Sequence, residues 1–132
     1  FNSQEEESES IENQLLRLVE YLQCLPLDMC AIDRVEADDT MAYLATKFQN
    51  DNEVVIMSSD QDFLQLVNDK ITIYSPTKKK FYTPERVKEE YGVTAQNYLQ
   101  MKILLGDNSD NVPGVPKLGP KKLIKNFPEL PV

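Results

Sequence analysis

The pattern of hydrophobic and polar positions predicts helices that alternate with short strands. Apolar side chains recur every three or four positions over residues 11–22, which is the period of an amphipathic helix. The same period returns over residues 41–48, and Thr83 followed by Pro84 marks the start of another helix. Further helices are predicted at residues 63–67, 84–91 and 94–105 and from Pro120 onward, and the inward face of the second helix is expected to hold Met41, Leu44, Ala45 and Phe48.

Short, mostly apolar runs predict three strands. Residues 27–32 and 54–57 have the composition of buried strands, residues 71–74 alternate as a strand does, and residues 81–82 are placed to pair back onto it. Strands separated by helices indicate an α/β fold with a mostly parallel sheet covered on both faces. Because a doubly wound domain begins with a strand and none precedes the helix at 11–22, we expect the fold to be incomplete at its N-terminus.

Composition narrows the range of functions. The 132 residues suffice for one domain with a buried core. No apolar run approaches the roughly 18 residues of a membrane span, so no membrane partner is expected. The start of the chain is acidic and polar, whereas a secretory signal is basic and then apolar. This difference favours the cytoplasm. Residues 1–10, where Ser and Glu alternate, predict an acidic flexible tail.

The net charge of −8 argues against a protein that is wrapped in nucleic acid through bulk electrostatics. The distribution of charge matters more than the sum. Residues 101–126 hold five lysines against Asp107 and Asp110. This end of the chain is therefore able to meet phosphates although the chain as a whole is not. The sequence has no histidine and two cysteines, so we do not expect a zinc site.

Acidic residues gather at three equivalent places in the predicted order of elements. One cluster follows the strand at 27–32 and opens a helix, and a second follows the strand at 54–57 and opens the next helix. The third follows the helix that ends at residue 105. Because parallel strands present their carboxyl ends at one edge of a sheet, the topology brings the first two clusters together. The candidate metal ligands are Glu36, Asp38, Asp39, Asp60, Asp62, Asp107 and Asp110.

Up to seven carboxylates around one cleft would repel one another strongly without cations. Hard divalent ions such as Mg²⁺ or Mn²⁺ take oxygen ligands and require no histidine or cysteine. Two such ions support phosphodiester cleavage, with Asp38, Asp60 and Asp62 as candidate catalytic residues. Each cluster also has a purely structural explanation, as helix N-terminal acids, as a cap with a solvated neighbour, or as turn formers. Their shared location favours the metal site.

A glycine-punctuated turn at residues 113–120 joins two predicted helices. Gly114 and Gly119 are able to take positive φ and to let a phosphate approach the start of the last helix. Such contacts position a duplex without reading its sequence. The alternative is a helix connector with surface lysines. The candidate DNA-binding residues are Gly114, Lys117, Gly119, Lys121, Lys122 and Lys125.

Three stretches, Val35–Asp39, Ser59–Leu66 and Gly106–Val115, resemble the successive acidic motifs of the 5′-nuclease family in order and spacing. The family includes flap endonucleases, the 5′→3′ exonuclease domain of bacterial DNA polymerase I, and the phage replication enzymes called ribonuclease H, which the sequence resembles most. The resemblance implies a PIN-like three-layer α/β/α domain, partial over residues 11–105. Over residues 106–132 it implies a metal-site loop and a helix–hairpin–helix element.

The resemblance also implies the chemistry. It implies cleavage of 5′ flaps, or 5′→3′ removal of RNA or DNA from a duplex during replication and repair, through a two-metal mechanism with Mg²⁺ or Mn²⁺ held by the acids named above. A monovalent cation is a further candidate at the hairpin. The implied substrate is a DNA or RNA–DNA duplex with a 5′ end or flap, in the cytoplasm of a bacterium or of a phage-infected cell.

Two departures from the family pattern bear on activity. Lys117 stands where the family's hairpin usually has its first glycine. The family's first strand with its metal-binding aspartate, its next acidic motif and its basic arch have no counterpart in the sequence. We therefore expect the C-terminal part of a 5′-nuclease that by itself cleaves very slowly or not at all, with a separate N-terminal half as a candidate partner. The alternative is a non-catalytic module that binds duplex or junction DNA. A PIN-type ribonuclease toxin would account for the acids but not for the hairpin.

Overall fold

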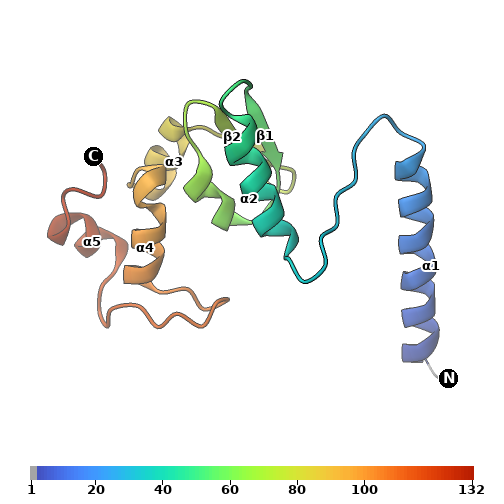
Figure 1. Cartoon of the computed structure of the whole chain (residues 1–132). Coiled ribbons are helices and arrows are strands. Elements are labelled where there is room, and N and C mark those ends of the chain that lie inside the picture. Colours follow the sequence, from blue (N-terminus) through green and yellow to red (C-terminus); the bar gives the residue numbers. More distant parts are fainter. Residues whose placement is uncertain (1–2) are drawn as a thin grey trace. The chain divides into compact units, whose positions relative to one another are not determined.

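The computed structural model describes residues 3–132, and the chain divides into two units, Phe1–Ala37 and Asp38–Val132, each described by itself. The first unit is built on helix α1 (Ser3–Gln23), and the segment from residue 24 to residue 36 has no regular structure (Figure 1). The helix begins at Ser3 rather than at the predicted Ile11. Acidic side chains near a helix N-terminus are favourable, which explains why the helix takes in most of the expected tail. Residues 1 and 2 lie outside the described residues.

The prediction of a buried strand at residues 27–32 is wrong for the described structure. The segment has no regular structure, and Leu27, Met29 and Ile32 are exposed. A strand needs a neighbour for its backbone hydrogen bonds. In the part of the first unit that the structure describes, the regular elements are helical and include no strand. Within its own unit the apolar run has therefore no neighbouring strand with which to pair.

The second unit holds a three-stranded mixed sheet (Figure 1). β1 (Val54–Met57) runs parallel to β2 (Ile71–Ser75), and β3 (Lys80–Tyr82) returns antiparallel to β2, which lies in the middle. The parallel pair and the returning strand both lie where the sequence predicts them, and the α/β fold class is confirmed. Met57 pairs with Tyr74, so the carboxyl ends of β1 and β2 lie at the same edge of the sheet.

One face of the sheet is buried. Ile56, Ile73 and Tyr82 are neighbours across the three strands, and none is more than 5% exposed. We expected cover on both faces, but in the part of the chain that the structure describes, Val55 and Met57 on the other face of β1 are 60% and 68% exposed. β1 therefore contributes to the core through one of its two faces.

Helix α2 (Ala37–Phe48) precedes β1 and packs through Ala45, which is 3% exposed, and Met41. Phe48, which we expected to face inward, is exposed. It is the last residue of the helix, where the chain turns away toward β1, and its carbonyl accepts a hydrogen bond from the turn at Asn52.

The remaining helices begin close to their predicted positions. α3 (Pro84–Tyr91) is capped by the side chain of Thr83 and ends at Gly92 with φ of 74°. The stretch predicted as one helix over residues 94–105 is a 3-10 turn, η2 (Ala95–Asn97), followed by α4 (Tyr98–Leu105). The 3-10 helix η1 (Gln61–Leu66) follows β1, and α5 (Pro120–Asn126) closes the unit. Within the described residues, no helix combines the length and the apolar character needed to cross a membrane.

Candidate metal site

The turn after β1 positions two acidic residues. The side chain of Asp60 accepts a hydrogen bond of 2.9 Å from the backbone N–H of Asp62 and so caps η1. Phe63 and Leu64 are 4% and 1% exposed and anchor η1 in the core. Because Asp62 directly precedes these anchors, its backbone is held in place while its side chain remains half-exposed.

The loop between α4 and α5 positions two further acidic residues, Asp107 and Asp110. Asp107 and Val112 exchange backbone hydrogen bonds, both of 2.8 Å. The carboxylate of Asp107 accepts hydrogen bonds from the backbone N–H of Ser109, at 2.9 Å, and from its hydroxyl. Gly106 has φ of 86°, and a Cβ at this position would lie 2.8 Å from the carbonyl oxygen of Val112. The loop folds back on itself at this glycine and carries Asp107 and Asp110 on one turn.

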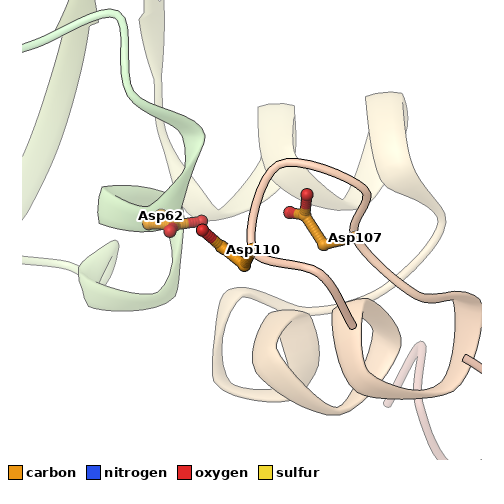
Figure 2. Close-up of side chains that lie close together, drawn as sticks. All are labelled: Asp62, Asp107 and Asp110. Carbon is orange, nitrogen blue, oxygen red and sulfur yellow. The ribbon is translucent and has the colours of Figure 1, made fainter. Parts of the chain in front are cut away.

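These segments bring three carboxylates together. Asp62, Asp107 and Asp110 each place one carboxylate oxygen within 4.8 Å of the others. Figure 2 shows that Asp62 approaches from η1 and that Asp107 and Asp110 approach from the loop after α4. A pocket of about 440 Å³ opens here, lined by Asp60, Gln61, Asp62, Lys102, Asp107, Ser109 and Asp110. Four acids that the sequence places in two separate clusters thus share one pocket.

A lysine reaches into the same cluster. The Nζ of Lys102 lies 2.6 Å from Oδ2 of Asp107 and 3.4 Å from Oδ2 of Asp110, and it also pairs with Asp62. Its neighbour Met101 is buried and fixes this part of α4 against the core. The side chain of Lys102 is 18% exposed, so its ammonium is shielded from most of the solvent.

Electrostatics favour the charged form of both partners. Hydrogen bonds from Lys102 and then from Ser109 hold the pKa of Asp107 well below its usual range. Burial by itself would lower the pKa of Lys102, but hydrogen bonds to Asp107 and Asp62 outweigh this effect and raise the pKa above its ordinary value. Burial raises the pKa of nearby Tyr98 to about 12. At neutral pH the lysine and Asp107 therefore form a charged pair beside a neutral phenol.

The donor set fits a hard divalent cation. Carboxylate oxygens are the ligands that Mg²⁺ and Mn²⁺ prefer. An octahedral Mg²⁺ site holds them about 2.0–2.1 Å from the ion, so two bound oxygens are at most about 4.2 Å apart, and the oxygens of this cluster lie within 4.8 Å of one another. The sequence has no histidine that would favour a softer metal. Asp62, Asp107 and Asp110 are therefore able to hold such an ion with small side-chain adjustments.

The acids that the sequence predicted as metal ligands at the start of the second helix do not belong to this cluster. They are Glu36, Asp38 and Asp39. Asp38 and Asp39 occupy the first turn of α2 and are exposed. Within the described residues they neither join the carboxylate cluster nor line the 440 Å³ pocket. Glu36 precedes α2 and belongs to the first unit. Negative charge at the start of α2 is favourable in itself, and metal ligation by these three residues stays a prediction.

The lysines predicted to meet phosphates are exposed on α5 and just before it. Lys121, Lys122 and Lys125 lie on the helix, and Lys117 lies just before it. Lys117 has φ of 63°, a left-handed conformation that glycine adopts most easily. Nζ of Lys122 donates a hydrogen bond of 3.3 Å to the carbonyl of Lys117. The position where the family usually has glycine therefore keeps a glycine-like backbone in this chain.

The two glycines of this turn differ. Gly114 has φ of 65°, as predicted, and a Cβ there would lie 2.5 Å from the carbonyl oxygen of Leu105. The prediction of positive φ for Gly119 is wrong, because its φ is −102°. A Cβ at Gly119 would meet no atom within 4 Å. Gly114 is required by a close crossing of two backbone segments, whereas the fold itself gives no steric reason for glycine at position 119.

Reasoning from the sequence missed Lys102 as a member of the site. The signal was available, since Lys102 is the sole charged residue of α4 and apolar residues lie on both sides of it. It also lies five residues before Asp107, where α4 leads into the acidic loop. A cation inside an apolar helix that leads into an acidic loop indicates an ion pair with that loop.

Residues 2–92 of the chain match the family described as the 5′-3′ exonuclease, N-terminal resolvase-like domain. The chain belongs to the 5′-3′ exonuclease family. The resemblance to the 5′-nuclease family is thereby confirmed, and the α/β architecture is that of a resolvase-like domain. The closer likeness to the phage ribonuclease H enzymes stays a prediction. The match includes η1 with Asp60 and Asp62, and the loop with Asp107 and Asp110 follows it.

The family relatives are longer proteins. The chain is 42% identical over 116 residues to DNA polymerase I of Bacillus subtilis (strain 168), a match that covers 82% of this chain and 13% of the polymerase. It is 37% identical over 118 residues to the 5′-3′ exonuclease of Buchnera aphidicola subsp. Schizaphis graminum, a match that covers 86% of this chain and 41% of the exonuclease. The chain therefore spans less than half the length of these relatives.

Solved structures agree with the family. The 5′-exonuclease of bacteriophage T5, determined with bound divalent zinc ions, matches with a TM-score of 0.73 and 26% identity over 92% of this chain and 48% of that chain. A T5 flap endonuclease in a pseudo-enzyme–product complex with DNA and metal ions also matches with a TM-score of 0.73 and 26% identity, over 92% of this chain and 47% of that chain.

Proposed function

We propose that this chain is part of a divalent-metal-dependent 5′-nuclease that removes 5′ ends or flaps of DNA or RNA during replication and repair. The observation that carries the proposal is the cluster of Asp62, Asp107 and Asp110, whose oxygens lie within 4.8 Å of each other in a chain of the exonuclease family. The T5 relatives with bound metal ions and DNA support the same chemistry. The bacterial relatives favour the cytoplasm of a bacterium or of a phage-infected cell.

The three clustered aspartates would hold a Mg²⁺ or Mn²⁺ ion, with Asp60 beside them in the same pocket. A second ion would need further ligands, for which we propose Glu36, Asp38 and Asp39. Such ions polarise a phosphate oxygen and lower the pKa of a bound water. The chain itself supplies orientation. Asp60 fixes the start of η1, and the hydrogen bonds from Ser109 fix the carboxylate of Asp107.

We place the duplex part of the substrate at the turn before α5. The exposed lysines 117, 121, 122 and 125 supply positive charge there, in a chain whose net charge is −8. Gly114 and Gly119 are the proposed points of backbone approach, and the open space around Gly119 supports the second of them. Contacts of this kind hold a duplex by its phosphates and carry no sequence preference.

A module that binds duplex or junction DNA without cutting it is the second candidate, because the exposed lysines would serve both functions. We propose that the chain by itself cleaves very slowly or not at all, since it spans less than half the length of the 5′-3′ exonuclease that it matches. A rate of about 1 s⁻¹ or more with this chain alone, within the usual range of enzymes, would contradict that proposal.

The double variant Asp60→Ala/Asp62→Ala separates the two candidates. The chain is incubated for long periods, in excess over a 5′-labelled flap duplex with Mg²⁺, and cleavage and duplex binding are both measured. A nuclease loses its metal-dependent cleavage in the double variant and keeps duplex binding. Asp51→Ala/Asp69→Ala is the matched control, because it removes two exposed acids outside the pocket. Cleavage that EDTA suppresses but that persists unchanged in the double variant would contradict the proposed site. A chain that binds the duplex but neither cleaves it nor binds Mn²⁺ would favour the second candidate.

A further inference from the structure

Three of the ion pairs in the described structure converge on a single atom, the Nζ of Lys102. This atom lies 2.6 Å from Oδ2 of Asp107 and 3.4 Å from Oδ2 of Asp110, and it also pairs with Asp62. The same three carboxylates have oxygens within 4.8 Å of one another. The ammonium therefore occupies the region that the cluster drawn in Figure 2 offers to a cation.

The arrangement differs from an ordinary surface salt bridge. The side chains of Lys102 and Asp107 are 18% and 19% exposed, so water and salt screen the pair weakly. The backbone of α4 just before the lysine is fixed by buried Tyr98 and Met101. The carbonyl of Lys102 also accepts a hydrogen bond of 2.8 Å from Gly106, which starts the acidic loop. The lysine and Asp107 are thus held close together by a short stretch of ordered backbone, while the side chains of Asp62 and Asp110 remain about half exposed.

The charges make the lysine and a metal ion competitors. Three ionised carboxylates carry a charge of −3, which the ammonium reduces to −2. A Mg²⁺ ion would lie about 2.0–2.1 Å from the same oxygens. The ammonium is 2.6 Å from one of them, and two cations held that close repel each other strongly in a partly buried site. A divalent ion can therefore use these three ligands only if the ammonium moves out of the cluster.

We propose that Lys102 is a built-in counter-cation that keeps the Asp62–Asp107–Asp110 cluster assembled without a metal ion, competes with the divalent ion for it, and so weakens the affinity of the site for metal. This inference rests on the proposed function, because it requires that the cluster binds a divalent ion. Lys102 is a positioning residue in this account. It determines where the carboxylates stand before the ion arrives and how readily the ion replaces it.

The substitution Lys102→Met tests the proposal, because it keeps an unbranched side chain and removes the charge. Lys88→Met is the matched control, since Lys88 is exposed on α3, outside the cluster and its pocket, and its loss changes the net charge by the same amount. Two readouts are needed on the full chain. Thermal unfolding in EDTA measures the stability of the metal-free protein, and calorimetric titration with MnCl₂ at constant ionic strength measures the affinity for metal.

We expect the two readouts to move in opposite directions. Lys102→Met leaves the carboxylates without a counter-charge, so the metal-free protein unfolds several degrees lower. The same variant binds Mn²⁺ about tenfold more tightly or better, because no ammonium has to be displaced. Lys102→Arg keeps the charge and retains the weak wild-type affinity. Lys102→Gln supplies a second neutral side chain, with the same expectation, should the methionine variant fail to fold. Lys88→Met changes neither readout.

A purely structural lysine gives a different result. If its loss merely loosens the site, stability and Mn²⁺ affinity fall together, and that outcome overturns the proposal, as does an unchanged affinity. If the wild-type chain binds Mn²⁺ and the neutral variants bind it equally well, only the role of Lys102 fails. If neither wild type nor variants bind Mn²⁺, the metal site of the proposed function fails with it.

Discussion

Gly114 and Gly119 lie five residues apart in one loop and serve different ends. Gly114 has φ of 65° and lies where the loop crosses the end of α4, with the carbonyl oxygen of Leu105 only 2.5 Å from the place of a Cβ. Gly119 has extended backbone and open space around it, at the N-cap of α5. The first glycine is fixed by the fold. The second leaves room for a function outside the fold, such as the approach of a phosphate.

Substitution by serine distinguishes the two glycines. Gly114→Ser should lower the free energy of unfolding by more than about 2 kcal/mol, because a left-handed conformation and a backbone clash act together. Gly119→Ser should leave it within about 0.5 kcal/mol or raise it, since serine is a good N-cap. Urea denaturation measures both. Equal losses in the two variants would show that the loop does not cross the end of α4 as described.

The pH dependence of stability tests the setting of Asp107. Its pKa is depressed in the folded chain through Lys102 and Ser109. The stabilisation is therefore complete above the unfolded pKa of about 3.9, and it is lost as the pH falls through the lower folded value. Asp107→Asn should be less stable than wild type at neutral pH, and the difference should shrink below about pH 4.

Urea midpoints measured between about pH 2 and pH 7 test this prediction. Asp69→Asn, at an exposed turn before β2, is the control and should follow the wild-type curve. A difference between Asp107→Asn and wild type that stays constant across the whole range would contradict the depressed pKa.

At the scale of elements, β1 shows what a strand pattern does and does not predict. Its apolar run predicted a strand and its parallel pairing, and both are present. The run also predicted burial on two faces, and one face is open in the described structure. Periodicity indicates that a segment will be extended. Whether each face is covered depends on distant residues that the local pattern does not contain.

Threonine substitutions at adjacent positions of β1 test the burial of one face. Ile56→Thr should lower the free energy of unfolding by about 2–4 kcal/mol, because it removes buried methyl groups and introduces a hydroxyl into the core. Val55→Thr keeps a β-branched side chain at a position that is 60% exposed, and should change stability by no more than about 0.5 kcal/mol. A large loss at Val55 would mean that this face is covered in solution.

Segments with strong local signals were predicted well. The Thr83–Pro84 start of α3 and the Pro120 start of α5 follow from capping and from the fixed φ of proline, which act within one turn. The segment at 27–32 failed, because a strand is stabilised by a neighbour and the described residues of its own unit supply none. Helix α1 begins at Ser3 rather than at Ile11, because the apolar stripe that predicted it gives no weight to acidic residues, which are favourable near a helix N-terminus.

At the scale of the whole molecule, the family and the candidate acidic residues were predicted from the sequence. The sequence did not show which of those acids lie together in the pocket. Asp60, Asp62, Asp107 and Asp110 share a pocket because the end of β1 and the loop after α4 meet there. The expected parallel sheet predicted that the acids after β1 lie at its carboxyl edge. It did not predict that the loop after α4 reaches the same place. Lys102 was missed because its signal is a single charge in an apolar helix, which neither apolar periodicity nor clusters of acids reveal.

The proposed nuclease site requires that the Asp62–Asp107–Asp110 cluster binds a divalent ion. Calorimetric titration of the full chain with MnCl₂ tests this directly, with Asp62→Asn and Asp107→Asn as probes and Asp69→Asn as a control of equal charge outside the pocket. We predict saturable binding that each probe weakens by about tenfold or more and that the control leaves unchanged. Binding that is absent in wild type, or that all three variants weaken equally, would contradict the account.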